Sequence, residues 1–499
     1  AAGAIGSLMA TLDISIVNAS LPTIQGEIGA SASEGTWVAT AYLVAEIVII
    51  PLTGWLERVF GLKRFLLGAA LLFTLFSVMC GMASTLPMMI AGRIGQGFTG
   101  GAMIPTAMTI IATRLPPRQQ PIGTAMFGAT VILGPVMGPL LGGWLTENFS
   151  WHYAFFINVP VCAALVGLLL IGLPDEEMQL DELISADWLG IAGMALGLGG
   201  LTVVLEEGHR EQWFESTMIW QLSALSLLGF VFIALGQFTA KRPVIKLALL
   251  RNRAFAAVFV LALILGAVLY GTSYVIPQFL AAIAGYNAYQ AGQVVFLSGI
   301  PALLMMPMIP LLIRFVDLRL AVAIGFATMA LTCWLDAYLS AGSSGEAFTV
   351  SQLLRGVGQV MGMMFLNQAA ISSVAQDEAG DAAGLFNAAR NLGGSIVLAL
   401  LATLQDARLD YHHWTINSAI QANDPGVQAW VQAQAAQGGG GPEGMAVALH
   451  QIDLGVIRDA LVMAFNDEFM ALAVAITAVV PLVLLLKPLP KGQISMAMH

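Results

Sequence analysis

Long apolar segments separated by short polar ones dominate this sequence. The apolar segments number fourteen and are centred near residues 12, 45, 75, 100, 132, 163, 197, 227, 267, 300, 329, 362, 394 and 475. Each is close to the length that crosses a bilayer, about 20 mostly apolar residues. Because lipid offers no hydrogen-bonding partner to the backbone, each segment must be a helix. The pattern therefore predicts an all-α polytopic membrane protein with fourteen transmembrane helices.

The basic residues predict how these helices are oriented. Lys and Arg collect in cytoplasmic loops, and most of the 20 basic residues fall in loops on one side of the predicted bundle. Since the number of spans is even, we expect both termini on the cytoplasmic side. The basic residues on that side are Arg58, Lys63, Arg64, Arg114, Arg118, Lys241, Arg242, Lys246, Arg251, Arg253, Arg314, Arg319, Lys487 and Lys491.

An internal repeat divides the chain into two halves. Residues 127–134 align with residues 386–393, and Arg355 with its neighbours echoes the surroundings of Arg93. Repeats of this kind are typical of transporters whose halves rock about a site at the bilayer midplane. We predict an N-terminal six-helix bundle over 1–173, an acidic linker with two inserted helices over 174–240, and a C-terminal six-helix bundle over 241–499.

The longest polar segment, residues 405–463, lies between the last two spans on the predicted non-cytoplasmic side. Asp424-Pro425 predicts a helix that runs to Gln437, since Pro suits a first helical turn. Glycines 438–441 end it, and Pro442 begins a second helix. A loop of this length is usually functional or disordered, and the helical pattern favours an ordered docking element.

The composition excludes several classes of protein. The chain is 58% hydrophobic and 10% charged, whereas soluble proteins carry about 25% charged residues. A net charge of −10 argues against nucleic-acid binding. We find no phosphate-binding glycine loop and no nucleophile–base pair, so neither ATP drive nor an enzyme is expected. His412-His413 have no further ligand at metal spacing, so no metal is expected.

Acids inside the spans are the first candidates for function. Asp13 lies in the middle of the first span and Glu46 in the middle of the second. An acid at that depth is a functional hypothesis by default, because a tuned buried carboxyl can take up and release a proton. We assign Asp13 as the first candidate proton carrier, Glu46 as the second and Arg93 as the tuning cation. The alternatives are an ion pair for Asp13, a helix contact for Glu46 and a static brace for Arg93.

Other polar residues within the spans, together with the flexible side chains of methionines, predict a binding pocket. The Gly and Pro residues of the ninth span, 270–278, predict a discontinuous helix along the pathway, or else aromatic packing with a kink. Methionines suit an adaptable apolar pocket. The candidate substrate-binding residues are Asn18, Tyr42, Gln96, Tyr270, Tyr274, Gln278, Met363, Asn367, Asn387, Arg390 and Asn391.

Two stretches resemble motifs of major facilitator transporters. Residues 93–97, Arg-Ile-Gly-Gln-Gly, resemble the arginine motif of the fourth helix. The run Gly134-Pro135 to Gly138-Pro139 resembles the "antiporter" motif of the fifth helix, typical of drug–proton exporters. With similar stretches at 12–22, 37–56, 277–286 and 464–469, the resemblance covers essentially the whole chain. It points to EmrB-type exporters, the fourteen-helix drug–proton antiporter branch of that superfamily.

One loop departs from the superfamily pattern. The loop between helices 2 and 3 usually reads Gly-x-x-x-Asp-Arg-x-Gly, and here it runs from Gly54 to Gly61 with Arg58 at the Asp position. The usual Asp-based latch is therefore in question, although EmrB-type members resemble this variant.

The resemblance implies a major facilitator fold and export of hydrophobic, often aromatic toxic compounds, driven by the proton-motive force without a cofactor. It also implies a place in the inner membrane of a Gram-negative bacterium, with an EmrA-type periplasmic adaptor and a TolC-type outer-membrane channel. Two alternatives remain open. One is a single-component proton symporter for a nutrient, and the other is a non-transporting membrane scaffold or receptor that uses residues 405–463.

Overall fold

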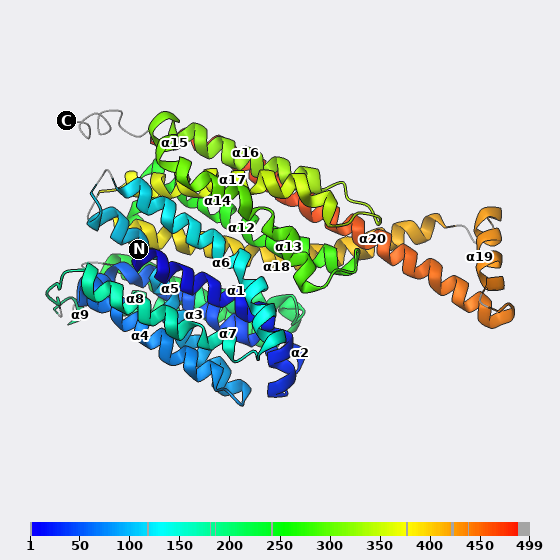
Figure 1. Ribbon diagram of the computed structural model, residues 1–499, viewed down its shortest axis with the longest axis horizontal. Coiled ribbons are helices and arrows are strands. Elements are labelled where there is room, and N and C mark those ends of the chain that lie inside the picture. The colour runs from blue at the N-terminus through cyan, green and yellow to red at the C-terminus, as the bar shows by residue number, and fades with distance from the viewer. Residues whose placement is uncertain are drawn as a thin grey trace.

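The computed structural model describes residues 2–116, 119–179, 181–184, 186–240, 243–375, 378–420, 424–437 and 439–487. Within these ranges the chain is helical and contains no strand. Figure 1 shows the helices lying side by side in two bundles, with a long helical hairpin projecting from one end. The all-α prediction is confirmed.

The N-terminal bundle is built around two long helix pairs. α1 packs along α6, and α3 packs along α5, with α4 between α5 and α8. The elements are α1 (Ala2–Ile28), α2 (Ala32–Gly35), α3 (Trp37–Phe60), α4 (Leu62–Gly81), α5 (Leu86–Arg114), α6 (Gln120–Asn148), α7 (Tyr153–Phe156) and α8 (Asn158–Gly172).

Two inserted helices follow the first bundle. α10 packs against α3 of the first bundle and α18 of the second, so it bridges the two, while α11 packs against α10. The elements are α9 (Asp181–Ile184), α10 (Trp188–Gly208), η1 (Trp213–Glu215) and α11 (Thr217–Thr239).

The C-terminal bundle repeats the arrangement of the first, with α12 packed along α18 and α16 along α17. Its elements are η2 (Leu247–Arg251), α12 (Arg253–Ala282), α13 (Ala288–Phe296), α14 (Gly299–Met305), η3 (Met306–Met308), α15 (Ile309–Phe315), α16 (Leu318–Asp336), η4 (Gly345–Phe348), α17 (Thr349–Ser372), α18 (Ala379–Ala419), α19 (Pro425–Gln437), α20 (Gly441–Val479) and η6 (Val480–Leu485).

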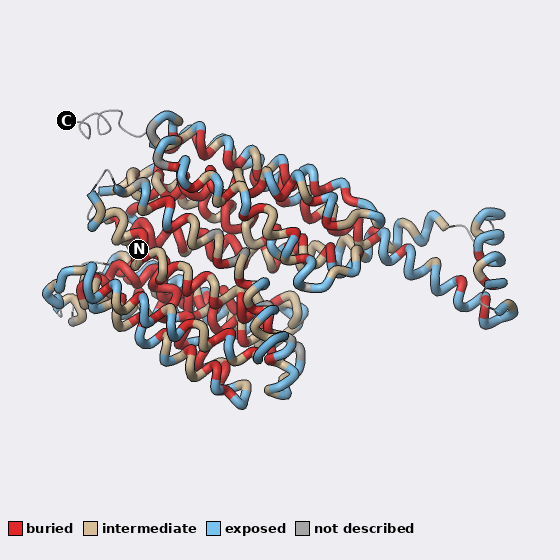
Figure 2. The backbone as a smooth tube through the Cα atoms, viewed as in Figure 1, coloured by how far each residue is buried: buried red, intermediate tan, exposed pale blue. Residues whose placement is uncertain are grey.

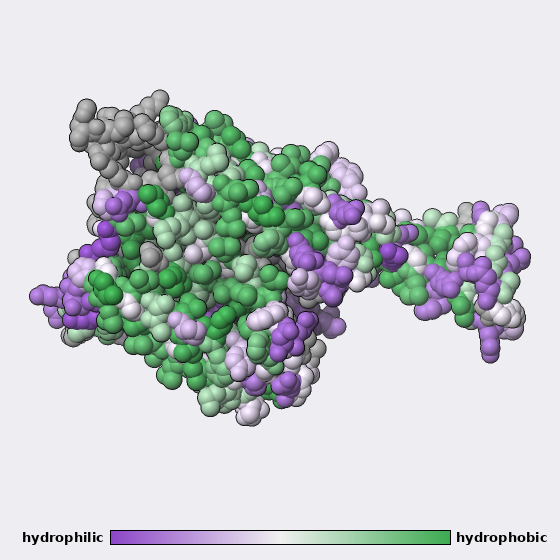
Figure 3. Space-filling view, in the orientation of Figure 1, coloured by the Kyte–Doolittle hydropathy of each residue, from purple (hydrophilic) through white to green (hydrophobic). Residues whose placement is uncertain are grey.

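Each of the fourteen predicted span centres falls within a helical segment. Among the described residues, ten helical segments are long and apolar enough to cross a membrane. The other four centres lie in α1, α5, α6 and α17, which carry polar or glycine-rich interior faces. Figure 2 shows buried residues along the facing sides of the helices, and Figure 3 shows a mostly hydrophobic outer face between hydrophilic ends. This distribution suits a bundle surrounded by lipid.

One prediction about helix continuity is wrong. The ninth span is an uninterrupted helix, α12, which contains Pro277. Pro277 lies near the end of α12, where the loss of one backbone hydrogen bond is tolerated by a packed membrane helix. The interrupted span is the tenth, where α13, α14, η3 and α15 follow one another. Its Pro residues at 301, 307 and 310 supply the breaks.

The polar segment 405–463 forms a helical extension. α18 and α20 continue beyond the bundle into it, and α19 lies at its tip (Figure 1). The predicted helix from Pro425 to Gln437 is confirmed, and the next begins at Gly441. α19 packs back on α20 through Val431, Ala435 and Ala448. In its described residues the segment is therefore mostly helical.

Candidate functional site

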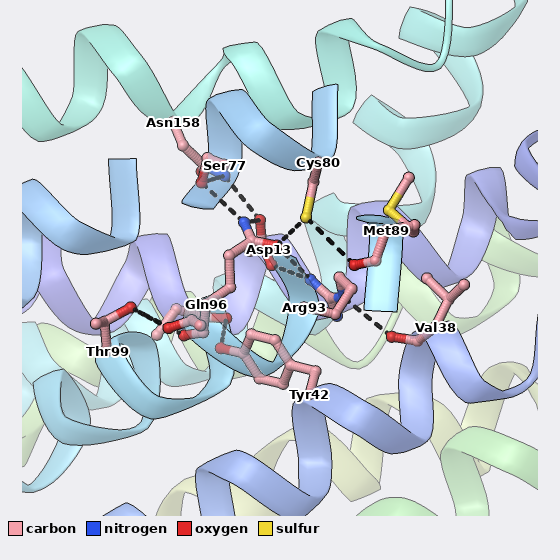
Figure 4. A network of polar contacts seen from close by, with 12 residues as sticks. Asp13, Val38, Tyr42, Ser77, Cys80, Met89, Arg93, Gln96, Thr99 and Asn158 are labelled. Atoms are coloured by element: carbon pink, nitrogen blue, oxygen red, sulfur yellow. Dashed lines mark hydrogen bonds and ion pairs between the residues drawn. The ribbon is translucent and has the colours of Figure 1, made fainter. Parts of the chain in front are cut away.

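Asp13 of α1 lies at the centre of a buried polar network in the N-terminal bundle (Figure 4). Its Oδ2 atom is 2.6 Å from Nη1 of Arg93, on α5. Its Oδ1 atom accepts hydrogen bonds from Gln96 Nε2 at 3.0 Å and from Asn158 Nδ2, on α8, at 2.7 Å. Both carboxylate oxygens are therefore engaged, and the side chain is 0% exposed.

Arg93 is held from other helices as well. Its Nε donates a hydrogen bond to Val38 O of α3 at 3.0 Å, and its guanidinium lies 4.3 Å from the ring centre of Tyr42. Gln96 Nε2 also donates to Ser77 Oγ of α4 at 2.8 Å. The network around Asp13 thus joins five helices, α1, α3, α4, α5 and α8. Asp13 and Arg93 form an ion pair in this structure, and whether Asp13 also carries a proton stays a prediction.

A cavity of about 250 Å³ lies between the two bundles. It is lined by helices of both halves, and four of the predicted substrate-binding residues face it: Asn18, Tyr270, Met363 and Arg390. Most of the lining is apolar or carries hydroxyl groups. The polar lining residues that sequence analysis missed are Thr11, Ser15, Thr272, Ser273, Ser298, Gln352, Arg355 and Gln359.

Arg355 is the most informative of these missed residues. Its Nη2 atom is 2.6 Å from Oδ2 of the buried Asp336, at the end of α16. Its Nε and Nη1 atoms have no hydrogen-bond partner, and the residue lines the cavity. The repeat that matches Arg355 to Arg93 was the signal in the sequence that pointed to it.

The remaining predicted residues lie away from this cavity. Tyr42 and Gln96 belong to the Asp13 network, and Asn387 donates to Ala383 O of its own helix at 2.9 Å. Asn367 is buried. Tyr274 and Gln278 are half-buried on α12 and do not line the cavity.

Glu46 is separate from the Asp13 network. It is 2% exposed and lines a small second cavity together with Asn391 and Tyr270. The Asn391 Oδ1 atom accepts a hydrogen bond from the Tyr270 hydroxyl at 3.4 Å. The predicted Asn391 therefore lies beside Glu46 in this small cavity and does not line the cavity of about 250 Å³.

The glycines of the antiporter-like run allow α6 to lie directly against α1. A Cβ atom at Gly134 or Gly138 would come within 3.0 Å of the backbone of Thr11 or Ser15. Pro139 lies near Gly292 of α13, across the interface between the bundles. The side chain of Pro135 lies outside the described residues.

Arg58 joins the two bundles at the end that carries the basic loops, which we call the basic end. Its Nη1 atom is 3.4 Å from Oδ1 of Asp381 on α18, and its Nε atom is 3.6 Å from Glu182 of α9. Lys246 also contacts Asp381, at 2.8 Å. The backbone permits this junction, since a Cβ at Gly54 would lie 3.2 Å from Asp381 and Gly61 has a φ of +77°.

The acidic linker packs on this junction. Glu176 pairs with Arg114 and accepts a hydrogen bond from Leu62 N at 2.9 Å. Lys63 lies 3.3 Å from Asp175. The contact between the bundles at this loop therefore pairs a cation on α3 with an acid on α18, and the linker lies beside it.

His412 of the helical extension contacts an acid. His412 lies 2.7 Å from Asp467, which also contacts Arg408 at 2.5 Å. Among the described residues, no three His, Cys, Asp or Glu side chains are placed to hold a metal ion.

Two homologous six-helix bundles around a shared cavity define a polytopic membrane transporter. The family model of the Major Facilitator Superfamily matches residues 3–398. The colistin resistance protein EmrB of Acinetobacter baumannii is 33% identical over 94% of this chain and 92% of its own length. The multidrug export protein EmrB of Escherichia coli K12 is 31% identical over 85% of this chain and 83% of its own length.

Solved structures show the same fold. The human organic anion transporter MFSD10 has a TM-score of 0.60 and 15% identity, over 95% of this chain and 98% of its own. The proton:xylose symporter XylE has a TM-score of 0.58 and 13% identity, over 95% and 93%. The chain belongs to the major facilitator superfamily and, within it, to the EmrB group. The resemblance seen in the sequence is confirmed.

Proposed function

We propose that the protein is a proton-driven exporter of hydrophobic toxic compounds. The observation that carries this proposal is the position of Asp13, which lies in a buried charge network on the same helix that lines the cavity. The names of the similar proteins, multidrug export and colistin resistance, support the same activity. No cofactor is needed, because the proton gradient supplies the energy.

The geometry suggests how proton and cargo are coupled. When Asp13 takes up a proton, its ion pair with Arg93 is lost, and α1 is no longer held to α5 and α8 by charge. Thr11, Ser15 and Asn18 of the same helix line the cavity, so a shift of α1 changes the cavity wall. If proton binding and cargo binding favour different positions of α1, the binding of one changes the affinity for the other.

The two ends of the bundle face opposite sides of the membrane and act differently during transport. The basic end faces the cytoplasm, and the Arg58–Asp381 contact closes that side when the cavity opens to the other. The cavity-lining residues of α12 and α17 lie between the middle of the bundle and the end from which the helical extension projects. Cargo enters from the cytoplasm or the inner leaflet, and protons run inward.

The helical extension is proposed to dock a periplasmic adaptor of the EmrA type, which leads to an outer-membrane channel of the TolC type. Its surface exposes large apolar side chains, including Trp414, Trp430 and Val447, which suit a protein contact. Deletion of residues 425–460 should abolish adaptor binding and whole-cell resistance while leaving transport by the purified protein intact. Unchanged adaptor binding and resistance would contradict this role.

Transport itself is tested in proteoliposomes with an imposed pH gradient and a hydrophobic fluorescent dye as cargo. We expect dye export driven by inward proton flow in the wild type, and its loss in Asp13→Asn. Glu443→Gln, an acid at the start of α20 in the extension, is the matched control and should export normally. Gradient-driven uptake in the same direction as the protons would favour the nutrient symporter.

A further inference from the structure

The small second cavity lies where three parts of the molecule meet. It holds about 20 Å³, which is room for about one water molecule. Its walls come from α3 of the first bundle, α10 of the inserted pair, and α12 and α18 of the second bundle. The polar side chains that line it are Glu46, Thr202, Glu206, Tyr270, Asn391 and Ser395.

Two carboxyl groups face this cavity without a full set of partners. Oε2 of Glu46 and Oε1 of Glu206 are buried and have no hydrogen-bond partner. The Asn391 and Ser395 side chains line the same cavity as the two acids. Asn391 and Ser395 are four residues apart on α18, so they lie on the same helix face and form a polar row between the two acids.

The charges around the two acids leave both without a close counter-ion. Within the described ranges, neither acid has a basic group within 4.0 Å. The other acid of α10, Glu207, is compensated by Arg210 at 2.7 Å and Thr40 at 2.7 Å. The titratable groups that face the pair from the surrounding helices are Tyr42 of α3, Arg93 of α5, Glu207 of α10, Tyr270 of α12 and Arg390 of α18.

We propose that Glu46 and Glu206 form one proton-binding site, bridged by Asn391, Ser395 and a water in the cavity. A buried carboxylate without a counter-ion is costly, and binding a proton removes that cost. The site joins α3, α10 and α18, so its proton occupancy changes how the inserted pair is held between the bundles. This inference rests on the proposed proton-driven transport, and it gives the inserted helix α10 a direct part in coupling.

Infrared titration of the full chain in lipid vesicles, without cargo, tests the site. The C=O band of protonated carboxyl groups should titrate with pH in the wild type. Glu46→Gln and Glu206→Gln should each remove part of it, and each should shift the frequency of the part that remains, because the proposed water in the shared cavity links the two acids. Ser395→Ala, which keeps all charges, should also shift the Glu206 band.

The matched control is Glu468→Gln on α20, since Glu468 is another buried acid whose carboxylate oxygens lack partners. It should lose its own band and leave those of Glu46 and Glu206 in place. Bands that disappear additively without a frequency shift, or a band change produced by Na⁺ and not by pH, would overturn the proposal. Because no cargo is used, failure of this test and failure of gradient-driven export are separate results.

Discussion

The two halves of the molecule place equivalent arginines in different surroundings. Arg93 in the N-terminal bundle is enclosed, with partners from α1, α3 and its own helix. Arg355 in the C-terminal bundle has one acid partner, Asp336, lines the cavity and has two N–H groups without a hydrogen-bond partner. We expect a division of roles between these two arginines, in which Arg93 belongs to the charge switch and Arg355 contacts cargo.

The packing of the two halves, by contrast, is nearly symmetric. Gly134 of α6 lies against Thr11 of α1, and Gly393 of α18 lies against Leu263 of α12. These two glycines align in the sequence repeat. The helix framework has therefore been kept in both halves while the polar residues on it have diverged.

The largest expected effect is on stability in the first half. Arg93→Ala leaves the buried Asp13 without its counter-ion and should lower the unfolding free energy by about 3–5 kcal/mol. Arg355→Ala should cost less, about 1–3 kcal/mol, because Arg355 lies between the cavity and Asp336, and its removal lets cavity water reach that acid. Denaturant unfolding in micelles measures both. Equal losses would remove the contrast between the halves.

Because the two halves pack alike at Gly134 and Gly393, substitutions at these two glycines should lower stability by similar amounts. Gly134→Val and Gly393→Val should each destabilise by about 1–3 kcal/mol, because a larger side chain forces the paired helices apart. The same unfolding measurement applies, with Gly143→Val as the control, since a Cβ there meets nothing within 4 Å. A neutral result at Gly393 together with a loss at Gly134 would show that the repeat is not a packing repeat.

Cargo affinity should fall when Arg355 of the C-terminal bundle is substituted. Arg355→Lys keeps the charge but removes the two unpartnered N–H groups of a residue that lines the cavity, and it should weaken dye binding roughly tenfold, the equivalent of one hydrogen bond. Fluorescence titration measures the Kd. Asn158→Ala, in the Asp13 network, should leave the Kd nearly unchanged, and a larger effect there than at Arg355 would reverse the assignment.

The smallest expected effect concerns the junction between the halves. Arg58 is 33% exposed, so Arg58→Ala should change stability by about 0–1 kcal/mol. It should nevertheless loosen the basic end and raise the thiol reactivity of a cysteine placed at Gly380. The charge-swapped pair Arg58→Asp with Asp381→Arg should restore the low reactivity. Unchanged reactivity in Arg58→Ala would exclude a latch.

Apolar periodicity and short motifs predict much of this structure from the sequence. The span centres, the helix from Pro425 to Gln437 and the superfamily all follow from apolar length, Pro and Gly signals and two motifs. The sequence does not predict which polar side chains line the same cavity, because that depends on how each helix is rotated about its own axis in the bundle. Arg355 and Glu206 were missed for this reason, and Pro277 was misjudged because neighbouring helices tolerate its lost hydrogen bond.

In the proposed mechanism the Asp13–Arg93 network couples proton flow to cargo movement. The most direct test compares two assays on Asp13→Asn in proteoliposomes: dye accumulation driven by a pH gradient, and dye–dye exchange without a gradient. We expect gradient-driven accumulation to be lost while exchange continues, because the cavity remains and only the coupling is removed. Gradient-driven accumulation at the wild-type rate in Asp13→Asn would show that this network does not couple the two flows.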